Sequence, residues 1–174
     1  MMTLIIISLV IFLAYLAGMY MYFGIPYSIS DTFYKLEARK QGVGWLFSAM
    51  CVSVGGLLLP ALLDITPESY QFTAFLVCAG LIFVGAAPQF KLSLTGSVHY
   101  GAATVCVIFS QVWVGLTCWW VLIPIWLAFI VYTVVTMSKH VTGNMWSDFV
   151  STKPMFWAEV AAMVATYVTI SRIF

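Results

Sequence analysis

The sequence has very few charged residues. Asp, Glu, Lys and Arg make up only 7% of its 174 residues, whereas 63% of the residues are apolar. Except for Glu159 and Arg172, every charged residue stands in a short polar stretch between apolar blocks that are long enough to cross a bilayer. A soluble domain needs a charged surface, so this composition indicates an all-α integral membrane protein, a helical bundle in lipid.

Other absences narrow the class of protein further. The net charge of +1 gives no basis for a nucleic-acid partner. There are only two histidines, His99 and His140, and no cluster of acidic residues, so we expect neither a metal site nor a cofactor. We also expect no disulfide framework, because no regular spacing pairs the four cysteines, Cys51, Cys78, Cys106 and Cys118.

The first apolar block lacks the features of a signal peptide. No side chain from Met1 to Phe23 is charged, whereas a signal peptide begins with a basic region. The block is also longer than the apolar core of about 7–15 residues that signal peptides have. We therefore expect it to remain as the first membrane span.

The apolar blocks predict six spans in a single transmembrane domain, residues 1–174. The block at residues 97–137 would form a helix about 60 Å long, about twice the thickness of the hydrocarbon core. It is therefore expected to be a hairpin that turns at residues 115–120, which include a glycine and two adjacent tryptophans. The predicted spans are about residues 4–23, 44–63, 70–87, 98–116, 121–137 and 155–173.

The basic residues predict the orientation of the chain. The opposite face of the bundle carries only Arg172, whereas six basic residues follow the first, third and fifth spans. By the positive-inside rule those six lie in the cytoplasm and both termini lie outside, in a cell membrane for which the bacterial inner membrane is the first choice. If residues 97–137 formed one span, everything after them would be inverted. The six residues are Lys35, Arg39, Lys40, Lys91, Lys139 and Lys153.

The polar segment 28–40 predicts a short amphipathic helix on the cytoplasmic surface. Ile29, Phe33 and Leu36 recur at helical spacing and would share one face. The basic end of this helix suits anionic lipid headgroups, at about 1 kcal/mol for each charge. The same charges would equally serve as an anchor that only fixes the topology. The candidate headgroup contacts are Lys35, Arg39 and Lys40.

Two ionisable residues lie inside predicted spans at similar depth. Glu159 lies about 4 residues, or roughly 6 Å, inside the sixth span, and His99 opens the fourth. A contact between them would favour a general base or a proton relay, so both are catalytic candidates. In the alternative interpretation each is a structural group satisfied near the interface. No nucleophile stands at a fixed spacing from them, so no catalytic residue is assigned.

A few uncharged residues in the spans favour contacts between helices. Gln111 lies deeper in the fourth span, where an amide most often forms a hydrogen bond to another helix. Small residues at 55–56 and at 161–165 allow close approach of a neighbouring helix. These small faces suit a homo-oligomer or a membrane partner as well as internal packing.

Two sequence patterns resemble known groups of membrane proteins. Residues 24–34 (GIPYSISDTFY), 85–90 (GAAPQF) and 98–103 (VHYGAA) resemble small, uncharacterised six-span proteins of gut bacteria and their phages, a group with no established function to transfer. The order of Pro88, a polar loop and His99 at the start of a span is similar to DRAM-like six-span membrane proteins. That resemblance implies a role in handling membrane lipids, with His99 as the family's hallmark residue.

Three classes of function fit these observations. The interpretation we adopt is a non-enzymatic membrane protein that binds lipid or a partner at its cytoplasmic face. The first alternative is a membrane-embedded enzyme or proton relay that uses His99 and Glu159, which would also need a nucleophile or a metal. The second is a transporter or channel, which would need an oligomer because no charge is predicted at mid-membrane in one chain.

Overall fold

The computed structural model describes residues 1–139 and 142–174, and these residues form helices and no strands. The all-α class is therefore confirmed, while His140 lies outside the described residues. The long helices are α1 (Met2–Phe23), α3 (Trp45–Ile65), α4 (Gln71–Ala86), α5 (Ser93–Cys118), α6 (Leu122–Lys139) and α8 (Pro154–Ile173). The short elements are α2 (Thr32–Arg39), α7 (Met145–Ser151) and the 3-10 turns η1 (Glu68–Tyr70) and η2 (Trp119–Val121).

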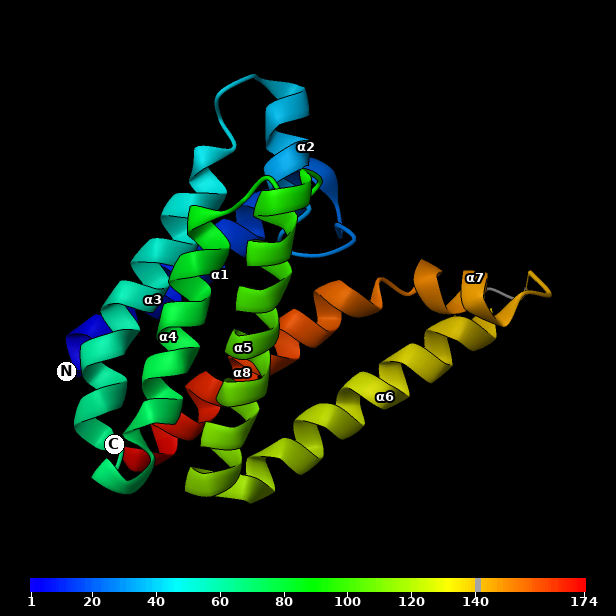
Figure 1. Cartoon of the computed structure of the whole chain (residues 1–174). Coiled ribbons are helices and arrows are strands. Elements are labelled where there is room, and N and C mark those ends of the chain that lie inside the picture. Colours follow the sequence, from blue (N-terminus) through cyan, green and yellow to red (C-terminus); the bar gives the residue numbers. More distant parts are fainter. Residues whose placement is uncertain (140–141) are drawn as a thin grey trace.

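Four helical stretches are long and apolar enough to cross a membrane. They are Met2–Phe23, Trp45–Ile65, Glu68–Ala86 and Ser93–Lys139, and they support assignment to the membrane proteins. The last stretch has 47 residues and contains α5, η2 and α6. Figure 1 shows that it bends sharply at η2, so that α5 and α6 form the two arms of a V.

Helices α3, α4 and α5 form one layer of the bundle, with α4 between the other two (Figure 1). Helix α1 packs against α3, and α8 packs against α5 and α6. Helices α1 and α8 contact each other through stacked rings of Phe12 and Tyr167, whose centroids are 6.3 Å apart. The Tyr167 hydroxyl donates a hydrogen bond of 3.0 Å to Ser8 Oγ. This second layer faces the first and leaves room for a cavity between the two.

Glycines set the close spacing of the α3–α4–α5 layer. A Cβ atom added at Gly80 would lie 2.9 Å from the carbonyl oxygen of Ala102, and one added at Gly85 would lie 2.7 Å from Cys51 Cβ. Contacts this short leave no space for a methyl group unless the backbone moves. The helices of this layer are therefore packed backbone against backbone.

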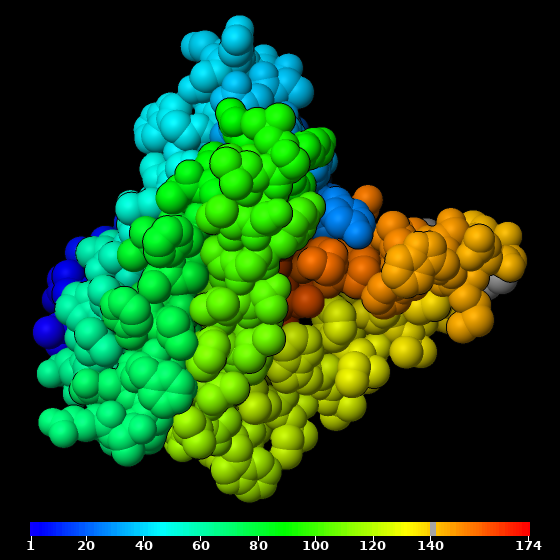
Figure 2. All heavy atoms as spheres, in the orientation of Figure 1, coloured from blue at the N-terminus to red at the C-terminus, as the bar shows by residue number. Residues whose placement is uncertain are grey.

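Helix α2 covers only the later part of the predicted amphipathic helix 28–40. Residues 28–31 form a turn instead, and α2 stands at one end of the bundle, beside the start of α5 (Figure 1 and Figure 2). Its basic residues lie over aromatic rings at the end of α1. Lys35 Nζ is 5.9 Å from the ring centroid of Phe23, and Arg39 Cζ is 4.8 Å from that of Tyr22.

The loop from α2 to α3 is held by one carboxylate. Glu37 accepts hydrogen bonds from the backbone N–H groups of Gly42, at 2.9 Å, and Gly44, at 2.6 Å. Because these bonds favour the ionised form, they hold the pKa of Glu37 below its ordinary value of 4.5.

We expect substitution of Gly85 by Ala to lower the thermal stability of the purified protein, because the added methyl group forces α3 and α4 apart. Gly56→Ala is the matched control, since a Cβ at Gly56 meets nothing within 4 Å. The control should be neutral or slightly stabilising, because Ala favours a helix over Gly by about 0.5–1 kcal/mol. Melting temperatures in detergent test this, and equal values for the two variants would contradict it.

We expect the α2–α3 loop to loosen in acid. A lowered pKa means that the carboxylate of Glu37 stabilises the loop at pH values above its unfolded pKa, and that this contribution is lost as pH falls through the folded pKa. Amide exchange at Gly42 and Gly44, corrected for the intrinsic pH dependence, should become faster over that range. In Glu37→Gln the acid-dependent step should disappear, and its persistence there would assign it to another group.

Candidate functional site

The segment between α1 and α2 enters the bundle after the exposed Tyr27 and forms a largely buried turn, residues 28–32. Ser28, Ile29 and Ser30 are only 7–8% exposed, and Thr32 is fully buried. Within the turn, the backbone N–H of Thr32 donates to the carbonyl of Ile29, and the N–H of Asp31 donates to Ser28 Oγ. Backbone groups inside a membrane bundle lack water as a partner, so the groups left over must bind other helices.

Helix α8 supplies two of those partners. The N–H of Ile29 donates a hydrogen bond of 2.5 Å to Glu159 Oε2. The N–H of Phe156, in the first turn of α8 where no intrahelical acceptor is available, donates to the carbonyl of Tyr27 at 3.1 Å. Glu159 therefore fixes the position of the buried turn.

His99 holds the same turn from helix α5. Its side chain is 2% exposed, with Nδ1 at 2.9 Å from the carbonyl oxygen of Ala87 and Nε2 at 3.0 Å from Ser30 Oγ. A carbonyl oxygen only accepts, so Nδ1 carries a proton, and in the neutral ring Nε2 then accepts from the Ser30 hydroxyl. The ring of Phe90 lies against the imidazole, with centroids 5.0 Å apart. Both ring nitrogens of His99 therefore have hydrogen-bond partners within the bundle.

The two candidate catalytic residues are connected through the turn. Glu159 binds Ile29 and His99 binds Ser30, so two consecutive residues lie between the carboxylate and the imidazole. No hydrogen bond joins His99 to Glu159 in the described part of the chain. The two side chains do not form the direct contact that would indicate a general base or proton relay. Instead, both hold the same turn.

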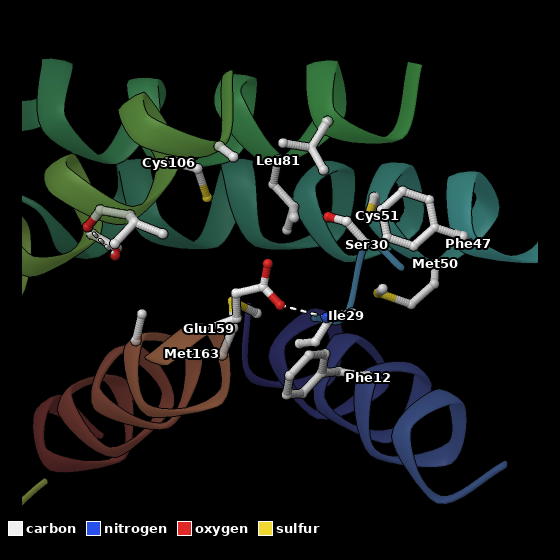
Figure 3. A pocket seen from close by; sticks show the side chains of 15 residues that line it. Phe12, Ile29, Ser30, Phe47, Met50, Cys51, Leu81, Cys106, Glu159 and Met163 are labelled. Carbon is white, nitrogen blue, oxygen red and sulfur yellow. Dashed lines mark hydrogen bonds between the residues drawn. The ribbon is translucent and has the colours of Figure 1, made fainter. Parts of the chain in front are cut away.

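A cavity of about 80 Å³ lies beside the buried turn. Figure 3 shows Glu159 pointing into it from α8, with Phe12 of α1 and Phe47 of α3 on other sides. Ile29 and Ser30 form part of its wall, and α4 and α5 supply the rest. Apart from the carboxylate and a few hydroxyl and thiol groups, the cavity has an apolar surface.

A second depression lies at the end of the bundle that carries α2. This cleft, which we call the basic-end cleft, has a volume of about 390 Å³ and lies between α2 and the loop that joins α4 to α5. Lys91 Nζ is 4.1 Å from the ring centroid of Tyr34, and the backbone N–H of Lys91 donates to the Tyr34 hydroxyl at 2.8 Å. The cleft is lined by Phe33, Tyr34, Glu37, Gln89, Lys91 and Leu92.

The remaining predicted site residues lie apart from the cavity. Lys40 is exposed next to Arg39 at the end of α2. Gln111 binds across the V of α5 and α6, since its Oε1 accepts from Trp126 Nε1 at 3.0 Å. In residues 1–139 and 142–174, no three His, Cys, Asp or Glu side chains form a group that could hold a metal ion.

Sequence reasoning missed the turn that joins the site together. Residues 28–32 contain three hydroxyl side chains, which favour turns by binding nearby backbone groups. That signal was available, but the apolar spacing of Ile29, Phe33 and Leu36 indicated a helix. The contact between the Tyr15 hydroxyl and Thr32 Oγ1, which ties the turn to α1, has no counterpart in any local pattern.

Comparison with known proteins adds no family to this description, because no family model, curated protein or solved structure significantly matches the chain.

We expect Ser30→Ala to destabilise the protein by about 1–3 kcal/mol, because it leaves His99 Nε2 buried without a donor. Ser97→Ala is the control, since Ser97 is exposed and its hydroxyl only binds the carbonyl of Ser93. Thermal unfolding in detergent measures the difference, and hydrogen exchange at Ile29 should increase in the Ser30 variant alone. Equal stability of both variants would show that the hydrogen bond does not hold the turn.

Proposed function

We propose that the protein is a six-span membrane protein, without enzymatic activity, that binds anionic lipid headgroups at the cytoplasmic end of its bundle. The observation that carries this proposal is the basic-end cleft, where the ammonium group of Lys91 lies over Tyr34. Helix α2, which carries Tyr34, also carries Lys35 and Arg39, and Lys40 follows directly after it. Such a group of cations beside a membrane attracts anionic lipids.

Helix lengths support the count of six spans. The stretch Ser93–Lys139 would be about 70 Å long if straight, far more than the roughly 30 Å of hydrocarbon that one span crosses. With the bend at η2, α5 and α6 count as two spans. Helix α8 has 20 residues, which is about the length that one span needs.

The positions of the termini support the proposed orientation. Figure 1 shows both termini on the same side of the bundle, away from α2 and α7. With the basic loops in the cytoplasm, both termini would then lie outside, as the positive-inside rule requires. The location that we propose is a cell membrane, with the bacterial inner membrane as the first choice.

The cleft has the chemistry that an anionic lipid needs. Lys91 offers a charge and Gln89 an amide donor, while Phe33 and Leu92 offer apolar surface for the first carbons of an acyl chain. The carboxylate of Glu37 also lines the cleft, but both of its oxygens are bound by the N–H groups of Gly42 and Gly44. The formal charges of Lys91 and Glu37 therefore balance within the lining, and the attraction that we propose for anions depends also on Lys35, Arg39 and Lys40 nearby on and after α2.

The alternative functions receive less support from the site. The Ser30 hydroxyl beside His99 has the arrangement of a nucleophile and its base. Acyl transfer also needs donors for the oxyanion, and the neighbouring donor, the N–H of Ile29, is already bound by Glu159. For a channel, the described part of one chain offers a small apolar cavity and no polar path.

We expect Lys91→Ala to weaken binding of phosphatidylglycerol about fivefold, which corresponds to about 1 kcal/mol for one lost charge. Lys139→Ala is the matched control, since it removes the same charge from the end of α6, outside the cleft. Native mass spectrometry or lipid titration into nanodiscs measures the affinity, with phosphatidylcholine as the neutral reference.

The lipid preference should also weaken as salt is raised, because the attraction is electrostatic. A triple variant with Lys35, Arg39 and Lys40 changed to Ala should lose still more of the preference for phosphatidylglycerol. Equal effects of Lys91→Ala and Lys139→Ala would contradict the assignment of the cleft, and unchanged binding in all variants would contradict the proposed function.

A further inference from the structure

The carboxylate of Glu159 has one oxygen that the protein leaves available to the cavity. Oε2 accepts the hydrogen bond from Ile29, while Oε1 has no recorded donor among the described residues. The two serines that line the cavity direct their protons elsewhere, Ser30 to His99 and Ser110 to the carbonyl of Val107. An ionised Glu159 presents an acceptor to the cavity, so an occupant that stabilises this form must bring a hydrogen-bond donor or a positive charge.

The other residues that line the cavity indicate which kind of cation would fit it. A hydrated divalent metal ion needs about six oxygen ligands, and one carboxylate with two engaged hydroxyls does not supply them. The rings of Phe12 of α1 and Phe47 of α3 instead offer aromatic surface, which attracts organic cations, on other parts of the cavity wall (Figure 3). Carboxylate, aromatic rings and an apolar lining together match an ammonium group attached to a short alkyl chain.

We propose that this cavity binds a small alkylammonium group, with its nitrogen at Glu159 and its carbons against Phe12 and Phe47. A volume of about 80 Å³ limits the ligand to a few heavy atoms. Such a group occurs in a free primary amine and in the headgroup of an ethanolamine lipid. The cavity shares no lining residue with the basic-end cleft, so this proposal stands independently of the proposed function.

The first test uses the wild-type chain in detergent, with propylammonium chloride as the probe. Propylammonium should raise the melting temperature in a saturable way, whereas 1-propanol, of the same size and without charge, and sodium chloride at equal ionic strength should not. A rise of the same size with 1-propanol would overturn the proposal, because the cavity would then bind a neutral solute. No rise with propylammonium would also overturn it.

The second test uses variants. Glu159→Gln should weaken propylammonium binding at least about tenfold, because it removes the charge-assisted contact. Glu68→Gln is the control, since this exposed carboxylate in η1 lies outside the cavity. If Glu159→Gln does not fold, Ala103→Leu keeps the carboxylate and fills the cavity, and it should abolish binding. Unchanged affinity in a folded variant at either position would place the amine elsewhere and overturn the proposal.

The third test separates the two sources of the ligand. Propylammonium affinity is compared in nanodiscs of phosphatidylethanolamine and of phosphatidylglycerol, using wild-type protein and Glu159→Gln in each. A lower apparent affinity in phosphatidylethanolamine that depends on Glu159 would support the proposal and identify the lipid headgroup as the competing ligand. Equal, Glu159-dependent affinity in both lipids would support a free amine as the ligand.

Discussion

Much of this structure depends on how a non-helical stretch of backbone is satisfied inside a bundle of apolar helices. The largely buried turn at residues 28–32 interrupts the helical pattern where most of its groups are shielded from water, so its free N–H and C=O groups need fixed partners. The partners come from α8 through Glu159 and Phe156, and from α5 through His99. These contacts join segments that are 69 to 130 residues apart in the sequence. The turn also positions α2 at the end of the bundle, and it forms one wall of the cavity.

The apolar blocks predict the helices, because a helix pairs its own backbone N–H and C=O groups and needs no partner from another segment. Spans were expected at residues 4–23 and 155–173, and helices lie there, α1 (Met2–Phe23) and α8 (Pro154–Ile173). Helix α1 is among the four stretches that are long and apolar enough to cross a membrane, whereas a sixth span at α8 stays a prediction. Agreement of this kind requires only that a stretch be apolar and long enough, and no knowledge of its neighbours. The bend at η2 was also accessible from length alone, since 47 residues exceed one bilayer crossing.

The buried turn could not be predicted from length and composition in the same way. Ile29 has the right spacing from Phe33 and Leu36 for one face of a helix, yet its backbone N–H binds Glu159 and its side chain lines the cavity. The local pattern carried no information about a partner 130 residues away, and that partner decides the conformation. For His99 and Glu159 the sequence correctly indicated that each polar group needs a partner, because leaving it unpaired among apolar residues is costly. It did not indicate that the partner of each is a residue of the turn rather than the other polar group.

Two carboxylates, one at each of the proposed sites, differ in how their oxygens are bound. Glu37, at the end of the bundle, has both oxygens bound by backbone N–H groups. Glu159, inside the bundle, has one oxygen bound to Ile29, and the other faces a cavity with an apolar surface. Opposite charges attract each other more strongly in apolar surroundings than in water, and for an ammonium group at Glu159 this attraction must offset the hydration that both charges lose. An anionic lipid at Lys91 competes with water and salt, whereas an ammonium group at Glu159 would compete only with the few molecules that a cavity of about 80 Å³ can hold.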